Sequence, residues 1–264
     1  MKSIQLSKSK LNVLERGSGG IPILFVHGFP LDHTMWRRQI DFFQEHERVI
    51  VPDLRGFGRS DVSTGTMTME QYADDLAEML EAMNVQEPVI FCGLSMGGYI
   101  GWQFWKRHRR RLRALVQCDT RAVADTPEAS ANRLKVAGRV VTEGTAFLAE
   151  AMLPKLFSPV TVKEQPEMVE AMRQVMLNAP PEGVAAASRG MAVREDFTAQ
   201  LEKIDVPTLI VVGDHDEIAP SAEMQTIADA IPDAVWLQIP YAGHMSPLED
   251  PAVFNDALAE FILL

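Results

Sequence analysis

The most informative run of the chain is Val89-Ile90-Phe91-Cys92-Gly93-Leu94-Ser95-Met96-Gly97-Gly98-Tyr99-Ile100. It combines an apolar strand, a tight turn of the pattern G-x-S-x-G and the start of a helix. A sharp strand-to-helix turn strains the serine backbone and pushes the Ser95 hydroxyl into the open. Such a sharp turn brings neighbouring backbone segments close to the serine. They can approach only where side chains are absent, which accounts for Gly93 and Gly97. The run predicts a serine nucleophile, whereas a Gly-Ser turn that merely caps a helix is the alternative.

A serine nucleophile needs a base to take its proton and a carboxylate to hold that base in the right tautomer. Candidates for both follow apolar runs further along the chain: residues 209–212 lead to Asp216, and residues 235–239 lead to His244. Active sites gather at the carboxyl ends of parallel strands, so these side chains can converge with Ser95. We predict a triad of Ser95 as nucleophile, His244 as base and Asp216 as acid.

Two other carboxylates and five other histidines compete for these roles. Asp214 is expected to brace its own turn, while Asp119 either does the same or supplies an alternative carboxylate. His27 precedes a glycine in a turn beneath the predicted site, and we expect it to fix that loop by hydrogen bonding. The remaining histidines lie in polar, loop-like or helix-end sequence and are predicted to be solvated: His33, His46, His108 and His215.

The tetrahedral intermediate of acyl transfer needs two hydrogen-bond donors for its oxyanion. Backbone amides are the obvious supply. We predict the N–H of Met96, directly after the nucleophile, and the N–H of Phe29, just past the apolar run 21–26. Pro30 restricts Phe29 to an extended backbone, which could preset the donor, although turn formation alone also explains this proline.

The rest of the chain alternates strand and helix patterns, which implies a mostly parallel sheet. Six apolar runs are typical of strands buried on both faces: 21–26, 49–51, 89–92, 112–118, 208–212 and 235–239. An opening hairpin is expected over residues 4–6 and 11–15. Helical patterns cover residues 35–43, 69–83, 96–106 and 220–231.

The alternation breaks between residues 121 and 195, where helix-prone sequence continues without a convincing strand. We predict a helical cap over 121–195 and a core domain made of 1–120 and 196–264. Within the cap, Met168, Met172 and Met176 recur every four residues and share one helix face. Packing between cap and core explains them, and a flexible apolar lining for an acyl or aryl group is the alternative.

Composition narrows the possible partners and the compartment. The 264 residues can bury one sizeable core without disulfide or metal support. With 36 acidic and 25 basic residues the formal charge is -11, which disfavours nucleic acid and anionic membranes as partners. No segment reaches the length of a membrane span, and the only two cysteines, Cys92 and Cys118, sit inside apolar runs. We predict a cytoplasmic protein.

Taken together, these motifs resemble the α/β-hydrolase family from the opening hairpin to the final helix. The matching segments are the oxyanion loop at 27–32, the turn at 52–61, the nucleophile elbow at 93–97, the acid loop at 213–220 and the dipeptide Gly243-His244. The resemblance implies an α/β-hydrolase fold, with a mostly parallel eight-stranded sheet flanked by helices and a helical cap after the sixth strand. It also implies that Asp216, rather than Asp214, is the acid.

Within that family the chain is similar to bacterial carboxylesterases, 3-oxoadipate enol-lactonases and cofactor-free perhydrolases. The resemblance implies hydrolysis of a small-molecule ester or lactone through an acyl-enzyme, with no metal and no organic cofactor. Haloalkane dehalogenases are disfavoured because their elbow carries an aspartate where this chain has Ser95. Perhydrolysis, suggested by the pair Phe29-Pro30, remains open, as do enol-lactones, N-acyl-homoserine lactones and a non-enzymatic ligand receptor. The oligomeric state is not predicted.

Overall fold

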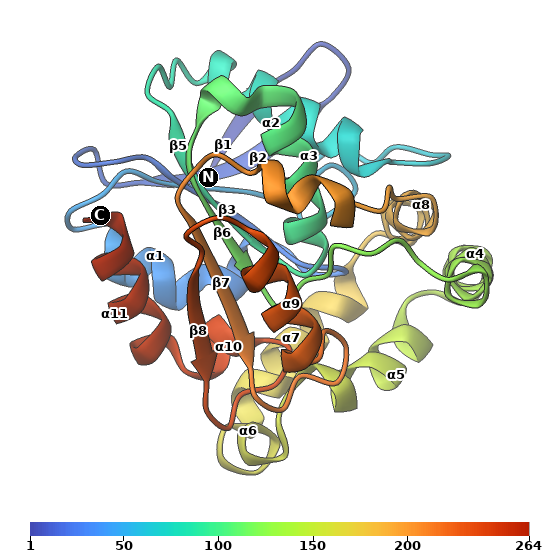
Figure 1. The fold of residues 1–264 in the computed structure, drawn as a ribbon. Coiled ribbons are helices and arrows are strands. Elements are labelled where there is room, and N and C mark those ends of the chain that lie inside the picture. The colour runs from blue at the N-terminus through green and yellow to red at the C-terminus, as the bar shows by residue number, and fades with distance from the viewer. Residues whose placement is uncertain (264) are drawn as a thin grey trace.

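The structure, a computed structural model, describes residues 1–263 and is built on one eight-stranded sheet (Figure 1). The strands are β1 (Lys2–Gln5), β2 (Lys10–Arg16), β3 (Ile23–Val26), β4 (Val49–Pro52), β5 (Val89–Leu94), β6 (Leu112–Cys118), β7 (Thr208–Gly213) and β8 (Val235–Ile239). Their order is β1-β2-β4-β3-β5-β6-β7-β8. Strand β2 is antiparallel to both of its neighbours, β1 and β4, and all other pairs are parallel. The predicted hairpin, strands and mostly parallel sheet are confirmed.

Helices cover both faces of the sheet. Successive strand residues point to opposite faces, so apolar side chains form a separate core on each side. Leu24 and Val26 point to the core under α2 (Met69–Ala82), α3 (Met96–His108) and α9 (Ser221–Ala230). Ile23 and Phe25 point to the core under α1 (Arg37–Phe43) and α11 (Pro251–Ile262). The described residues contain no helix long and apolar enough to cross a membrane.

The helix expected over residues 35–43 has a different start in the structure. It begins as the 3-10 turn η1 (His33–Trp36) and continues as α1. The side chain of Asp32 accepts a hydrogen bond from the N–H of Thr34, so the chain turns helical two residues earlier than the apolar pattern indicates.

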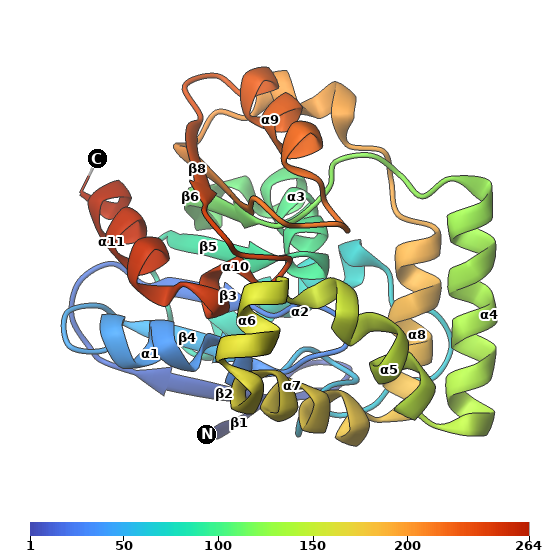
Figure 2. The ribbon, with the colours of Figure 1, turned by 90° about the horizontal axis from the view of Figure 1, so that it is seen from below.

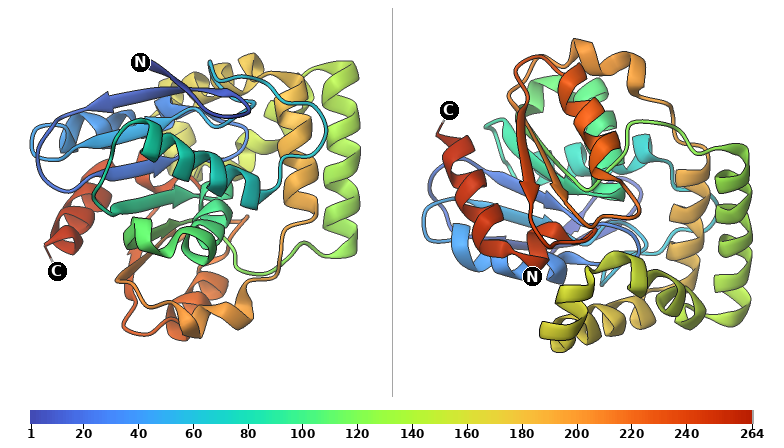
Figure 3. Two further views of the ribbon diagram at one scale, coloured as in Figure 1. Left: turned by 90° about the horizontal axis from the view of Figure 1, so that it is seen from above. Right: turned by 60° about the horizontal axis from the view of Figure 1, so that its bottom comes forward.

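Between β6 and β7 lie five α-helices: α4 (Pro127–Glu143), α5 (Ala146–Leu156), α6 (Pro159–Glu164), α7 (Pro166–Asn178) and α8 (Pro181–Ala192). Four of them begin at a proline, whose fixed φ suits the first helical position. Helices α4 and α8 pack side by side, with α4 outermost (Figure 2). Helices α5 to α7, coloured yellow-green, lie below the strands in the right-hand view of Figure 3. The division of the chain at residues 121 and 195 into cap and core stays a prediction.

Helix α8 reaches the core through two glycines one heptad apart. A Cβ on Gly183 would overlap the backbone of Gly56, which lies in the turn after β4. A Cβ on Gly190 would overlap the carbonyl group of Met67. Because backbone atoms cannot rotate away, only glycine permits this approach of helix to loop. The N–H of Met67 adds a hydrogen bond to the carbonyl of Ala186, at 3.0 Å.

We predict opposite effects on stability for alanine at two helical glycines. Gly183→Ala should lower the free energy of unfolding by about 1–3 kcal/mol, because the new methyl group strikes backbone. Gly138→Ala, in α4, should raise it by about 0.5–1 kcal/mol, because apart from its own helix no atom lies within 4 Å of the new Cβ. Urea unfolding of both variants measures the difference. Equal midpoints would contradict the close contact at Gly56.

Candidate active site

Ser95 occupies the turn between β5 and α3 with a strained backbone. Its φ of 55° and ψ of -111° lie where few residues other than glycine are found. A Cβ on Gly93 would overlap the carbonyl group of Gly97, and one on Gly97 would overlap the carbonyl of Val26 at the end of β3. The two glycines of the G-x-S-x-G pattern are therefore required by backbone contact.

The backbone of Ser95 is held by the end of β6. Its N–H donates to the carbonyl of Cys118 at 2.9 Å, and its carbonyl accepts from Thr120 Oγ1 at 2.8 Å. The side chain is half-buried. Within residues 1–263 no hydrogen bond joins the Ser95 hydroxyl to His244. In unliganded sites such a contact is often long or misaligned and tightens only when substrate binds.

Two backbone N–H groups flank Ser95 without an acceptor. The loop after β3 passes beside the serine, since a Cβ on Gly28 would lie 3.5 Å from Ser95 Cβ. Among the hydrogen bonds of residues 1–263, none has the N–H of Phe29 or of Met96 as donor, although both residues are buried. Buried amides are rarely left unpaired, so this pair is suited to an anionic oxygen.

His244 and Asp216 are in direct contact. They follow β8 and β7, and His244 Nδ1 lies 2.8 Å from Asp216 Oδ2, with exposed fractions of 2% and 6%. The other carboxylate oxygen accepts hydrogen bonds from the N–H groups of Ile218 and Ala219, at 2.7 and 3.0 Å. A carboxylate fixed in this way places the proton of the imidazole on Nδ1, which leaves Nε2 free to accept another.

Asp119 acts as a brace between loops. It follows β6, and its Oδ1 accepts from the N–H of Gly213 at 2.9 Å while its Oδ2 accepts from Ser246 Oγ at 2.5 Å. Burial, and then the neighbouring charge of Asp216, raises the pKa of Asp119. Both of its oxygens face partners other than His244, so the geometry favours Asp216 over Asp119 as the carboxylate beside the imidazole. Asp214 is exposed.

His27 fixes the loop after β3, as predicted. Its Nδ1 lies 2.9 Å from the carbonyl oxygen of Gly28, and its Nε2 accepts from the N–H of Leu54 at 3.0 Å. Burial lowers the pKa of His27, in keeping with a neutral ring that donates from Nδ1 and accepts at Nε2.

Two of the four histidines that were predicted to be solvated are half-buried and paired with carboxylates. His108 Nε2 lies 2.7 Å from Asp74 Oδ1, and His33 Nδ1 lies 2.6 Å from Asp53 Oδ1. Both partners are distant in sequence, so the local polar pattern gave no sign of them. Burial acts to lower the pKa of His33, but the hydrogen bond to Asp53 outweighs it and raises that pKa.

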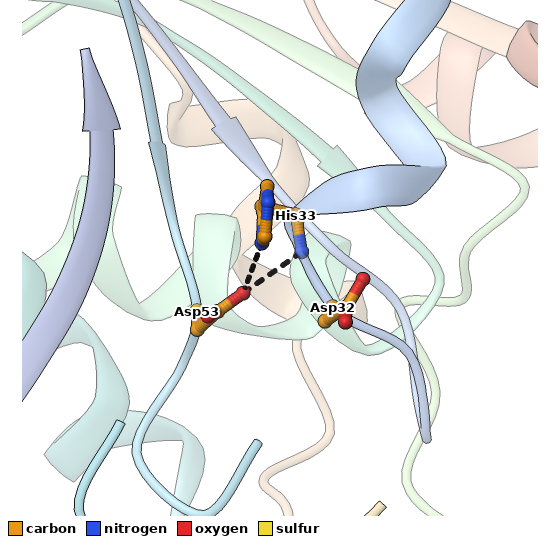
Figure 4. Close-up of side chains that lie close together, drawn as sticks. All are labelled: Asp32, His33 and Asp53. Atoms are coloured by element: carbon orange, nitrogen blue, oxygen red, sulfur yellow. Dashed lines mark hydrogen bonds and ion pairs between the residues drawn. The ribbon is translucent and has the colours of Figure 1, made fainter. Parts of the chain in front are cut away.

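Asp32, His33 and Asp53 form a cluster with ligand-type atoms within 4.8 Å of one another (Figure 4). The contacts of Asp53 are already made: Oδ1 accepts from the backbone N–H and Nδ1 of His33, and Oδ2 accepts from Asn12 Nδ2 and the N–H of Arg59. Burial acts to raise the pKa of Asp53, but these hydrogen bonds lower it to about 2. The cluster therefore serves to brace the loops after β3 and β4.

A cavity of about 490 Å³ lies beside this cluster. Its walls are residues 30–34, part of the turn after β4 and the C-terminal half of α7. Ser95, Asp216 and His244 do not line it. The residues that line this cavity are therefore different from Ser95, Asp216 and His244.

Met168, Met172 and Met176 lie on α7 and pack into the core. Met172 and Met176 are buried and Met168 is partly buried against the same hydrophobic cluster, together with Leu153 and Phe157. This agrees with packing between α7 and its neighbours. A role as the lining of a substrate pocket stays a prediction.

Two polar residues near His244 were missed by the sequence analysis. Ser246 donates to Asp119, and Glu249 accepts from backbone N–H groups on either side of His244. Both belong to the short helix α10 (Ser246–Glu249). The only available signal was their position within five residues of the histidine, since nothing in the pattern distinguishes them from helix-start residues.

Comparisons with known proteins agree with this architecture. The solved structure of a thermophilic esterase from Thermogutta terrifontis, with malate bound, matches with a TM-score of 0.96 at 45% sequence identity, over 99% of this chain and 97% of that chain. The enol-lactonase from Burkholderia xenovorans LB400 matches with a TM-score of 0.93 at 28% identity, over 100% of both chains.

A relative in sequence points the same way. The 3-oxoadipate enol-lactonase 2 of Acinetobacter baylyi is 27% identical over 249 residues, which cover 94% of this chain and 91% of that protein. The family described as alpha/beta hydrolase fold matches residues 21–251. This match spans most of the sheet, the helices between β6 and β7 and the loops of the candidate site, and it shows that the chain belongs to the alpha/beta hydrolase fold family.

Proposed function

We propose that this protein hydrolyses carboxylic esters or lactones through an acyl-enzyme formed on Ser95. The contact between His244 Nδ1 and Asp216 Oδ2, at 2.8 Å, carries the proposal. It supplies an oriented imidazole at the carboxyl edge of the sheet, where β5 also delivers the strained serine. An oriented imidazole beside a serine at such a turn is the arrangement that acyl transfer requires.

The reaction follows from the roles of these groups. His244 Nε2 takes the proton of Ser95 as its oxygen attacks the substrate carbonyl carbon, and Asp216 stabilises the imidazolium that forms. The N–H groups of Phe29 and Met96 receive the oxyanion of the tetrahedral intermediate. Collapse expels the alcohol, which takes its proton from His244. Water then gives a proton to the same imidazole as it attacks the acyl-enzyme, and His244 returns that proton to the Ser95 oxygen as the acid is released.

The relatives support the choice of bond. An esterase at 45% identity and an enol-lactonase at 28% identity share nearly the full length of this chain. Esters and lactones present the same carbonyl chemistry, so one site can serve either. We also propose that residues 121–195 form a cap over the site. The methionines of α7 would then contribute apolar side chains to the substrate pocket beneath that cap.

Replacement of the nucleophile tests the proposal. The Ser95→Ala variant should lose hydrolysis of short p-nitrophenyl esters, because no oxygen remains to form the acyl-enzyme. Initial rates for wild type and variant, with circular dichroism to check the fold, measure the effect. Turnover retained in Ser95→Ala would refute the assignment of Ser95 and the acyl-enzyme with it.

The two buried aspartates give a second test. Asp216→Asn should lower kcat on the order of 10³- to 10⁴-fold, because an amide favours the wrong imidazole tautomer. Asp119→Asn should mainly lower thermal stability, since its carboxylate binds the N–H of Gly213 and the hydroxyl of Ser246. Steady-state kinetics and thermal melts of both variants distinguish them. Near wild-type turnover in Asp216→Asn would overturn its role.

A further inference from the structure

Glu249 is a buried carboxylate whose partners are all backbone N–H groups. It is 6% exposed, and no salt bridge to it occurs in the described residues. Its Oε1 accepts from the N–H groups of Gly243 and Met245, at 2.8 and 3.2 Å. Its Oε2 accepts from the N–H of Ser158 at 2.9 Å. Three donors on one carboxylate form a set of charge-assisted hydrogen bonds, which are stronger than neutral ones.

Two of these donors are the residues directly before and after His244. Gly243 and Met245 meet at one carboxylate oxygen, so the backbone of the intervening residue is held at both ends. The N–H of Glu249 in turn donates to the carbonyl of Met245 at 2.9 Å, which closes the loop on itself. Since χ angles start from the backbone, a fixed backbone at residue 244 fixes where the imidazole can point.

The third donor belongs to the segment between β6 and β7. Ser158 lies between α5 and α6, next to Phe157. The N–H of Met245 is shared between Glu249 and this junction, because it also donates to the carbonyl of Leu156 at 3.1 Å. The contact is tight, because a Cβ on Gly243 would lie 2.7 Å from the nitrogen of Ser158. The loop of His244 and the α5–α6 junction are therefore joined through one carboxylate.

We propose that Glu249 is a positioning residue for His244, which holds the base in register with Asp216 and ties it to the α5–α6 junction. This inference rests on the proposed function of the same site. Glu249 does not touch the reacting atoms. It acts through the backbone on either side of the imidazole, whereas Asp216 acts on the ring itself.

Glu249→Gln and Glu249→Ala test the inference, with Glu260→Gln as a matched control. Glutamine offers one acceptor oxygen and places an NH₂ group against N–H donors, while alanine offers no acceptor. Glu260 is exposed on α11 and belongs to no part of the site. If Glu249→Ala does not fold, Glu249→Gln, which keeps the side-chain shape, carries the test.

The kinetic readout is kcat for a short p-nitrophenyl ester, counted per active site titrated with a fluorophosphonate probe. A base misplaced by about 1 Å should cost on the order of 10²-fold in kcat for Glu249→Ala, with a smaller loss for Glu249→Gln. KM should change by less than about threefold, because substrate binding groups are untouched. A purely structural role would lower Tm and the titrated fraction but leave kcat per site unchanged, and that result would overturn the inference.

A spectroscopic readout is independent of turnover. The proton shared between His244 Nδ1 and Asp216 should give a far-downfield ¹H NMR signal in wild type and in Glu260→Gln. It should be lost or broadened in both Glu249 variants and absent in Asp216→Asn. An unchanged signal in the Glu249 variants would count against the inference even if the wild type proved inactive on esters. Ser95-dependent turnover with unaltered Glu249 variants would instead leave the proposed function standing and remove the positioning role.

Discussion

Close contact between three backbone segments at Ser95 is the constraint on which the rest of the structure depends. Strand β3, strand β5 and helix α3 meet where Gly28, Gly93 and Gly97 leave no side chain between them. The serine keeps a positive φ because the close contacts of the surrounding backbone leave it no other conformation. The turn also lies next to β6, where Cys118 at the end of the strand and Thr120 just after it bind the serine backbone, so the sheet holds the serine in place.

Backbone N–H groups, rather than cations, hold the buried carboxylates around His244. Asp216 binds the amides after β7, Asp119 binds one amide and a hydroxyl, and Glu249 binds three amides. An amide cannot change rotamer as a lysine or arginine side chain can. Each carboxylate therefore fixes loop backbone as well as satisfying its own charge, and the histidine between them gains its orientation from several loops at once.

Besides apolar packing, two physically different kinds of contact attach the helices between β6 and β7 to the loops of the core. Helix α8 uses glycines to bring helix and loop backbones into van der Waals contact at Gly56 and Met67. The α5–α6 junction uses hydrogen bonds to the loop that carries His244. The first contact depends on glycines, because any side chain would separate the two backbones. The second consists of hydrogen bonds, and it involves the residues directly beside His244.

Local pattern in the sequence was sufficient for the strands, the elbow around Ser95, the order of the triad candidates and the helical segment after β6. Apolar runs, glycine spacing and strand-to-loop transitions act over a few residues, so they can be seen without coordinates. The partners of Asp119 and His33, and the contact of Glu249 with Ser158, could not be seen in this way, because each joins loops that are distant in sequence. The placement of the methionines of α7 likewise required the tertiary structure. The sequence already favoured Asp216 over Asp119 as the acid, and the contact with the imidazole supports that choice. Hydrogen bonds and burial depend on which segments the fold brings together, and that is decided by packing of the whole chain.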